Sequence, residues 1–409
     1  MSTEFDFNKF KEQAIEELRS GKGIIGNDNV LLPMIKHLLE EGLNAELDSH
    51  MNDERTHSPE TKNRKNGVTS KTMKTSIGNF TLETPRDREG NFNPELVEKH
   101  QTYLDETFAE TILSLYSKGL SHREIQKFLM DTYGTKISSG KISEITDRIL
   151  PEIKKWQERQ LESIYSVVWM DAIHFSVKDE KSKRYIKKAV YIVLGLDMQG
   201  KKDVLSFTLG ENESASFWSS ILEDLRNRGV EDILIACIDN LSGFNSAIEA
   251  HFPKTDIQHC IVHQIRNSIK YCSSKDSREL LSDLKDIYKA VNLTAATTAM
   301  DVFEDKWLDK YPLIVKSWRN NWEYLTRYFD YSPEIRRLMY TTNPVEGVNR
   351  QIRKYTKSRG PFSCDKALEK IVYVALSEIS KKWIGRALFW GQVQQQLLIR
   401  FEERCGIIH

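Results

Sequence analysis

The chain has 409 residues, and its 59 Lys and Arg balance 59 Asp and Glu, so the formal net charge is zero. This length is enough for two or three domains with a large core. The apolar runs are too short to cross a bilayer, the polar N-terminus is unlike a signal peptide, and five scattered cysteines do not form a disulfide framework. We therefore expect a cytoplasmic protein without a membrane partner.

The first part of the chain predicts helices followed by a basic segment. Residues 1–50 are expected to be helical, because "NVLLPMIKHLLEEGLNAEL" repeats Leu, Ile and Met at helical spacing. Residues 51–100 form the second predicted region. It begins with an exposed polar linker to about residue 75, and a small hairpin turns near Gly78 and Asn79.

Positive charge is concentrated in this second region. From Lys62 to Arg88 there are seven Lys or Arg against two acids, Glu83 and Asp87. Clustering of cations, rather than net charge, is the signature of nucleic-acid binding. Arg64 and Lys65 are therefore candidate phosphate contacts.

Residues 101–155 predict a helix-turn-helix-like region. One helix ends near Gly119. A second begins after the N-cap Ser121, with Glu124 in a capping box, and ends at Gly134, and a third starts near Ser138 or Ser139. Such a unit is compatible with docking in a DNA major groove. The same pattern is also typical of three plain structural helices.

The chain changes to alternating strands and helices from residue 156 to 274. Three strand-like runs are followed by a helix, the buried strand "DILIACID", a helix, a short strand and another helix. This is the element order of the ribonuclease-H-like fold, an α/β class with a mixed sheet. Residues 275–338 predict helices throughout, the core resumes at 339–360, and 361–409 predict a helical C-terminal region.

Two aspartates are candidate metal ligands. Asp171 is expected at or near the end of the first strand, and Asp239 ends the fourth. In this topology the two strands are neighbours, and two carboxylates that close need a cation between them. Mg²⁺ prefers carboxylate oxygens. The alternative for each Asp is a turn or a helix cap.

Glu346 in "YTTNPVEGVNRQIRKYTKSRG" also has two interpretations. Asn343 is a suitable N-cap and Pro344 a suitable first helical residue, so Glu346 fits a capping box. It can equally be the third metal ligand. An ordinary surface pair with Arg350 is a further alternative.

The face of that helix favours DNA. Val345, Val348, Ile352 and Tyr355 form an apolar stripe, and a separate row contains Glu346, Arg350, Arg353 and Lys357. A capping Glu requires no row of cations. Arg350, Arg353 and Lys357 are therefore candidate contacts to a phosphate backbone.

These segments resemble the Mutator-like transposases of bacterial insertion sequences, which belong to the DDE class. The resemblance is carried by "VVWMDAIHFSVKDE", "ILIACIDNLSGFNSAIEAHFPKTDIQHCIVHQIRNSIKY" and the Glu346 segment, and it extends over nearly the whole chain. It implies that Asp171, Asp239 and Glu346 form the catalytic triad with two Mg²⁺ or Mn²⁺ ions. It also implies a helical insertion before Glu346 and an N-terminal region that binds terminal inverted repeats.

Two positions depart from the family's usual pattern, and three further residues are accessory candidates. Asn240 stands where the family usually has Gly, and Gly347 varies a familiar motif, but neither change removes a carboxylate. The family's Cys-x-x-His motif falls on Cys260 and His263. We favour packing or a position near DNA over zinc, because a structural zinc site needs four ligands. His174 can reach phosphate or simply alternate along its strand.

The sequence thus predicts a metal-dependent DNA transposase. It is expected to bind double-stranded DNA, at the element ends and at the target, as a homodimer or larger assembly near the bacterial nucleoid. The first alternative is a catalytically inactive DNA-binding protein derived from a transposase, for which Asn240 is the only hint. The second is a nuclease of the same fold.

Overall fold

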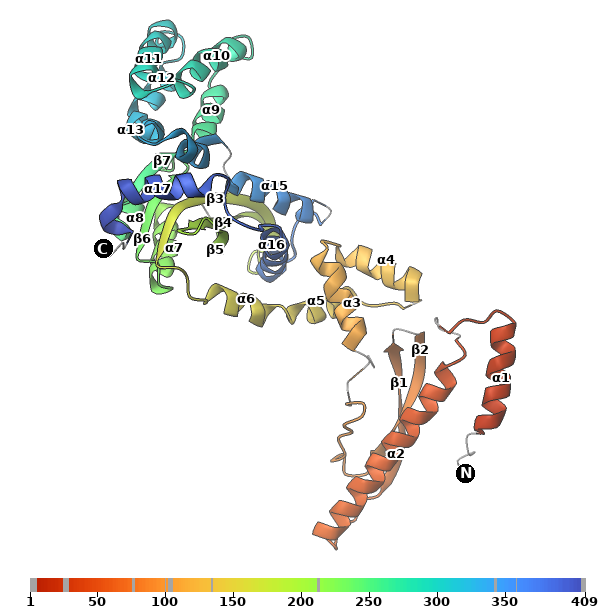
Figure 1. Cartoon of the computed structure of the whole chain (residues 1–409). Coiled ribbons are helices and arrows are strands. Elements are labelled where there is room, and N and C mark those ends of the chain that lie inside the picture. Colours follow the sequence, from red (N-terminus) through yellow and green to blue (C-terminus); the bar gives the residue numbers. More distant parts are fainter. Residues whose placement is uncertain are drawn as a thin grey trace. The chain divides into compact units, whose positions relative to one another are not determined.

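The computed structural model describes residues 6–24, 29–75, 78–99, 101, 106–133, 135–211, 214–341, 344–357 and 359–405 (Figure 1). The chain divides into two compact units, Met1–Arg148 and Ile149–His409. Among the described residues, no helix combines the length and the apolar character that crossing a membrane requires.

The first unit combines helices with one hairpin. Its elements are α1 (Phe7–Arg19), α2 (Leu32–His57), β1 (Lys65–Thr75), β2 (Gly78–Asp87), α3 (Glu106–Ser117), α4 (His122–Tyr133) and α5 (Ser139–Asp147). The predicted hairpin is present, since β1 and β2 pair antiparallel from Thr75↔Gly78 outward. Most of the linker expected from residue 51 to about 75 is exposed, as predicted, but it is helical to His57 and a strand from Lys65 instead of an irregular segment. Helix α2 continues to His57 because Met51 is buried against Phe92.

The three helices α3, α4 and α5 lie where the sequence predicted them. The capping box is formed: the Ser121 amide donates to Glu124 Oε2 at 2.7 Å, and the Glu124 amide donates to Ser121 Oγ at 3.3 Å. Gly119 has φ +89°, as a helix-ending glycine requires. Ser138 caps α5 through the Lys141 amide. Gly134, the expected end of α4, lies outside the described residues.

A buried carboxylate closes the hairpin of the first unit. Asp87 at the end of β2 is 2% exposed. Its Oδ2 accepts hydrogen bonds of 2.9 Å from the Asn63 side chain and from the Asn91 amide. Burial raises the pKa of Asp87, but these hydrogen bonds outweigh it and lower the pKa below its usual value.

The second unit is built around a mixed sheet. Its first elements are α6 (Leu150–Gln157), β3 (Ile164–Lys178), β4 (Tyr185–Asp197), β5 (Lys202–Gly210), α7 (Ala215–Asn227), β6 (Asp232–Ile238), α8 (Phe244–His251), β7 (Asp256–His259) and α9 (Ile261–Lys270). The sheet order is β5-β4-β3-β6-β7. Strands β3, β4 and β5 pair antiparallel, whereas β3, β6 and β7 pair parallel. The first and fourth strands of the unit are neighbours, as predicted.

The remainder of the second unit is helical. The elements are α10 (Ser277–Tyr288), α11 (Leu293–Trp307), α12 (Pro312–Asn320), α13 (Trp322–Thr326), η1 (Arg327–Asp330), α14 (Pro333–Arg336), η2 (Arg337–Thr341), α15 (Pro344–Thr356), α16 (Asp365–Ser380), α17 (Trp390–Arg400) and η3 (Glu402–Arg404). No strand interrupts the described residues between 275 and 338. That stretch is therefore helical, as the sequence predicted.

The two faces of the sheet are covered by different helices. Met170 of β3 packs in a core cluster with Trp218 of α7 and Phe244 of α8, whose rings stack at 4.6 Å. Because side chains alternate along a strand, Trp169 and Asp171 face the other way. That second face contacts α15 and α16.

The expected position of Asp171 at the end of a strand is wrong. Asp171 is in the middle of β3, which extends from Ile164 to Lys178. The apolar pattern in the sequence ends before the strand does, because the side chains in the second half of β3 are only partly buried. The pairing of β3 with β6 ends at Trp169↔Cys237, so Asp171 lies just past the end of the parallel pairing.

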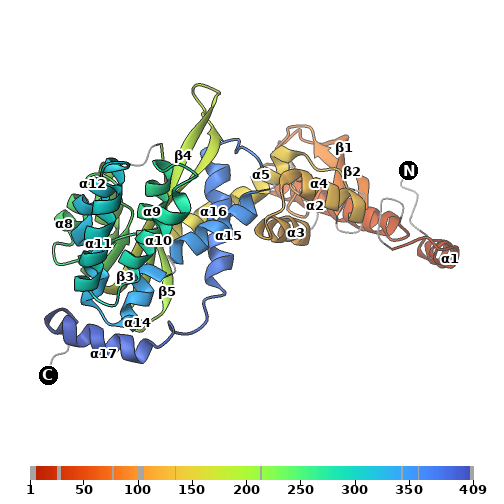
Figure 2. The same ribbon diagram turned by 90° about the horizontal axis from the view of Figure 1, so that it is seen from above.

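Beyond the sheet, β3 and β4 continue as a two-stranded ribbon. The last β4–β5 pair is Ala189↔Gly210, while β3–β4 pairing runs on to Lys178↔Tyr185. We call residues 174–189 the ribbon. Figure 2 shows it projecting from the sheet. Phe362 supports its base: the Phe362 amide donates to the Ser176 carbonyl at 2.9 Å, and its own carbonyl accepts from the Lys178 amide at 2.9 Å.

Candidate active site

Asp171 is held in place by two hydrogen bonds. Its side chain is on the face of β3 opposite Met170, and the residue is 7% exposed. Its Oδ1 accepts from the Ala172 amide at 2.8 Å, and its Oδ2 accepts from the Asn349 side chain at 2.6 Å. A nearly buried carboxylate needs such donors, since burial without them is costly.

Asp239 follows the last residue of β6 directly. It is two residues beyond Cys237, as Asp171 is two residues beyond Trp169, and Trp169 and Cys237 are the paired residues of the two strands. The parallel register therefore brings both residues to the same level, just past the end of the β3–β6 pairing. The Asp239 carboxylate forms an ion pair with Nδ1 of His263 on α9.

Glu346 lies in the first turn of α15 and is paired across space. Arg266 of α9 donates to Glu346 Oε1 at 2.5 Å, and His263 Nε2 is 3.8 Å from the same oxygen. Its cationic partner is thus Arg266 rather than Arg350 of its own helix. Asn343, the expected N-cap, lies outside the described residues.

His263 joins two of the predicted acidic residues. One ring nitrogen meets Asp239 and the other faces Glu346. Burial lowers the pKa of His263, but the Asp239 carboxylate and the Cys260 thiol outweigh burial and raise the pKa to about 11. The imidazolium therefore neutralises part of the acidic charge around it.

The family motif residues Cys260 and His263 meet Asp239. Single ligand atoms of these three residues lie within 4.8 Å of one another, the only such grouping among the described His, Cys, Asp and Glu. Three donors of mixed type leave a four-ligand zinc site incomplete. His259 is engaged elsewhere, because its Nε2 is 2.9 Å from Asn245 Oδ1.

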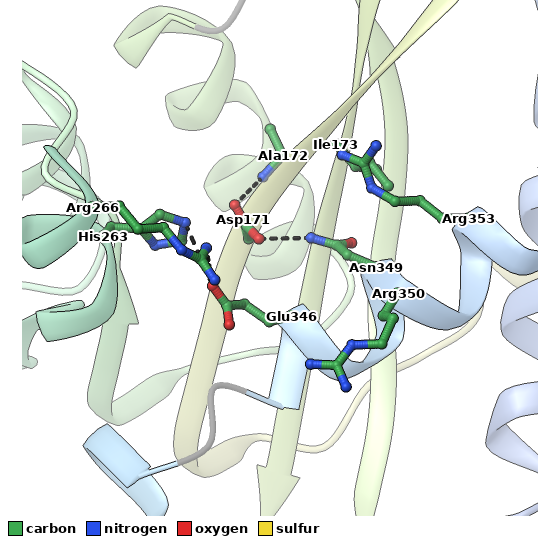
Figure 3. A pocket seen from close by; sticks show the side chains of 9 residues that line it. All are labelled: Asp171, Ala172, Ile173, His263, Arg266, Glu346, Asn349, Arg350 and Arg353. Carbon is green, nitrogen blue, oxygen red and sulfur yellow. Dashed lines mark hydrogen bonds and ion pairs between the residues drawn. The ribbon is translucent and has the colours of Figure 1, made fainter. Parts of the chain in front are cut away.

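A pocket of about 320 Å³ collects these groups (Figure 3). Asp171 and Glu346 both line it, from β3 and α15, and Asp239 is connected to it through the ion pair with His263. Figure 3 shows Glu346 and Arg266 directed toward each other, with Asn349 reaching Asp171 from α15. The full lining consists of Asp171, Ala172, Ile173, His263, Arg266, Glu346, Asn349, Arg350 and Arg353.

The basic row of α15 is exposed as expected. Arg350, Arg353 and Lys357 are all exposed, and the first two line the pocket. The opposite stripe is buried: Val345 and Ile352 are 0% exposed. Cations thus lead from the pocket along the helix.

Three other predicted site residues lie elsewhere. In the first unit, Arg64 and Lys65 are exposed, and Lys65 Nζ forms a 2.6 Å ion pair with Asp48. His174 is exposed on β3 and is not among the described residues that line the pocket. Burial and the cations Lys187 and Arg353 lower the pKa of His174.

Sequence reasoning missed two residues of the pocket, Arg266 and Asn349. Each follows a predicted site residue by three positions in a helix, Arg266 after His263 and Asn349 after Glu346. Residues three apart share a helix face. That spacing was a usable signal, because a polar residue beside a metal-ligand candidate on one face is a natural positioning partner.

Comparisons with known proteins agree on one family. The sequence model of the family described as "Transposase, Mutator family" matches residues 7–386. The transposase for insertion sequence element ISRM3 of Rhizobium meliloti is 38% identical over 398 residues, covering 96% of this chain and 98% of that protein. A probable insertion-sequence transposase of Corynebacterium diphtheriae is 39% identical, covering 73% and 86%.

Among solved structures, the Drosophila P element transposase strand transfer complex aligns with a TM-score of 0.30 and 12% identity. The alignment covers 73% of this chain and 81% of that one. A score this low carries no structural argument.

Proposed function

The chain belongs to the Mutator family of transposases, and we propose that it binds the terminal inverted repeats of an insertion sequence, cleaves DNA at the element ends and transfers the freed strand into target DNA. The observation that supports this proposal is a pocket with cations at its rim that Asp171 and Glu346 both line, and to which Asp239 is linked by its ion pair with His263.

The catalytic core is proposed to be ribonuclease-H-like, formed by residues 156–274 and 339–360 with 275–338 as its helical insertion. The sheet order β5-β4-β3-β6-β7 supports this assignment, because it has three antiparallel strands followed by two parallel ones. In open α/β sheets, sites gather where the carboxyl ends of neighbouring parallel strands meet. Asp171 and Asp239 meet that condition at the end of the β3–β6 pairing.

The donor set fits hard divalent cations. Carboxylate oxygens are the ligands that Mg²⁺ and Mn²⁺ prefer. The three acidic residues are accompanied here by His263 and Arg266, so the site already requires positive charge to balance it. Asp171, Asp239 and Glu346 would hold two ions. When bound, these ions would lower the pKa of an attacking water or 3′-hydroxyl and stabilise the leaving oxygen.

The remaining pocket residues position the reactants. Asn349 fixes the rotamer of Asp171 through its 2.6 Å hydrogen bond. Arg350, Arg353 and Lys357 would lie along the phosphate backbone, which gives affinity without sequence preference. His263 neutralises charge beside Asp239 and Glu346, a role that replaces the zinc alternative for Cys260 and His263.

Recognition of the element ends is assigned to the first unit. Its three helices α3, α4 and α5 contact one another in the order expected of a helix-turn-helix unit. Arg64 and Lys65 are exposed cations at the start of β1 and would contact phosphates. Two ends must be brought together before joining, so we propose a homodimer or larger assembly on DNA, acting at the nucleoid.

Strand transfer of a duplex oligonucleotide that carries the element end tests the proposal. With Mg²⁺ or Mn²⁺, the full chain is expected to nick the end and join its 3′-hydroxyl to a target plasmid. Tight binding of the end without cleavage would instead favour an inactive transposase-derived protein. Cleavage without joining would favour a nuclease of the same fold.

A further inference from the structure

The ribbon has one covered face and one bare face. Phe175, Val177 and Ile186 share the first face, where the Phe175 ring meets the Phe362 ring edge-on at 5.9 Å. Opposed residues of paired strands share a face, and side chains alternate along each strand. The second face therefore consists of residues that are all exposed: His174, Ser176, Lys178, Tyr185 and Lys187.

The ribbon is strongly cationic in a chain of zero net charge. From Lys178 to Lys188 there are six Lys or Arg against Asp179 and Glu180. Asp179 is used in the turn, where its carboxylate accepts from the Ser182 amide at 2.6 Å. Lys188 is paired with Asp365 at 2.5 Å.

Among the described residues, the other five cations of the ribbon have no carboxylate partner of the kind that Lys188 has. Within the described part of the chain, no carboxylate lies within ion-pair distance of Lys178, Lys181, Lys183, Arg184 or Lys187. Like charges gathered on one projection repel one another, and an anionic partner relieves that repulsion. Surface charge also protects sheet edges from aggregation, but that purpose does not require an excess of one sign.

The shape of the ribbon matches a duplex. A two-stranded β-ribbon fits the DNA major groove, and its flanking cations then reach phosphates on either side. Tyr185, which is 59% exposed between Arg184 and Ile186, adds an exposed ring with a hydroxyl donor.

The ribbon and the pocket share a single strand. Lys178 is seven residues beyond Asp171 on β3. At about 3.3 Å per residue the two are about 23 Å apart, and at about 3.4 Å per base pair this distance corresponds to roughly seven base pairs. Between these two points, burial, Lys187 of the ribbon and Arg353 of α15 all lower the pKa of His174, so cations of both elements act on the same residue.

We propose that the ribbon binds double-stranded DNA roughly seven base pairs from the phosphate at the Asp171 pocket, with Lys178 and Lys187 of the bare face, and Arg184 beside them in the turn, on the phosphate backbone. The inference rests on the proposed function for the position of the scissile phosphate. The contact to DNA itself rests only on the ribbon.

The test compares the full chain with the triple variant Lys178→Gln, Arg184→Gln, Lys187→Gln. Binding to fluorescent element-end duplexes is measured without divalent metal as salt is varied. The duplexes end about four or about twelve base pairs from the cleavage position, on either side. Loss of three phosphate contacts is expected to reduce the slope of log affinity against log salt by about 2.7. It is also expected to abolish the preference for the longer duplex.

A matched control neutralises three exposed lysines elsewhere, Lys275→Gln, Lys285→Gln and Lys289→Gln. This control is expected to keep the preference for the longer duplex. Glu180→Gln removes an acid from the ribbon and is expected to tighten binding, so the inference stays testable if the triple variant is unstable.

An unchanged salt slope and an unchanged length preference in the triple variant would overturn the inference. Equal competition by an A-form RNA duplex would also overturn it, since the deep, narrow RNA major groove does not admit a ribbon. If ribbon variants lose DNA binding while the unaltered chain never cleaves, the proposed function fails and the ribbon contact stands. If the chain cleaves and joins normally but the ribbon variants bind as before, only the ribbon inference fails.

Discussion

The side-chain amide of Asn349 on α15 donates a 2.6 Å hydrogen bond to the carboxylate of Asp171 on β3, across a separation of 178 residues. The other carboxylate oxygen accepts from the Ala172 amide. Both oxygens of a nearly buried acid are therefore oriented before any ligand arrives. A helix that follows the helical stretch 275–338 thus sets the geometry of a residue in the first strand of the sheet.

Replacing Asn349 by Ala is expected to weaken metal binding and strand transfer by about 10- to 100-fold, because ligand-orienting partners have effects of that size. Mn²⁺ affinity by calorimetry measures the first effect, and the end-joining assay measures the second. Lys354→Ala, on the exposed side of the same helix, is the control and should leave both unchanged. Native Mn²⁺ affinity in Asn349→Ala would show that the hydrogen bond does not position Asp171.

Glu346→Gln separates the two interpretations of that residue. Gln serves a capping box as well as Glu does, but it is a far poorer ligand for Mg²⁺. The variant is expected to retain its melting temperature within a few degrees and to lose strand transfer. Full activity would return Glu346 to a capping role and leave the third ligand unassigned.

Arg266→Ala is expected to change metal affinity and activity in opposite directions. Arg266 pairs with Glu346 in the structure, so its removal frees a carboxylate and should tighten Mn²⁺ binding. The gain is small, at most about fivefold, because an exposed ion pair contributes up to about 1 kcal/mol. Strand transfer should fall, since a cation beside the reacting phosphate is lost. Weaker Mn²⁺ binding in Arg266→Ala would contradict the premise that Arg266 competes with the metal ion for Glu346.

Much of the sheet could be predicted from the sequence, because buried strands such as "DILIACID" leave an unmistakable apolar run. Asp171 was misplaced because the second half of β3 has polar residues on its bare face, which look like the end of a strand. Hydrogen-bonded pairing with β4 keeps the second half of β3 in a strand. A single sequence does not show which segment a strand pairs with.

The site was predicted less completely than the sheet. Asp171, Asp239 and Glu346 were proposed from strand order and from the family resemblance. The hydrogen bond from Asn349 and the ion pair from Arg266 depend on how α15 and α9 approach β3, and local patterns do not determine that approach. The helical conformation of residues 51–57 was missed in the predicted polar linker for a similar reason, since Met51 and Phe92 pack together from distant positions.

The first unit should lose stability in acid through Asp87. Its pKa is lowered in the folded protein by the hydrogen bonds from Asn63 and Asn91. The stabilisation is therefore fully present above the unfolded pKa of about 3.9 and is lost as pH falls through the lowered folded value. Asp87→Asn should cost about 1.5 to 3 kcal/mol near pH 6, and the cost should fall progressively as the pH is lowered below the unfolded pKa.

Hydrogen exchange of the β2 amides, corrected for intrinsic rate, measures this effect in the full chain. All eight tryptophans lie after residue 155, so their fluorescence reports on the second unit and serves as an internal control. An equal loss of protection above and below the unfolded pKa would assign the effect of Asp87→Asn to packing instead of charge.

Because β3 is one unbroken strand from the pocket into the ribbon, its backbone fixes the distance between Asp171 and the cations of the ribbon. In the proposed complex with DNA, the spacing between the cleaved phosphate and the phosphates bound by the ribbon would be set by residue count rather than by a hinge. Adding two residues to each strand of the ribbon would increase this distance by roughly 7 Å, about two base pairs, and would keep each side chain on its present face of the ribbon. Adding one residue would turn the cations inward.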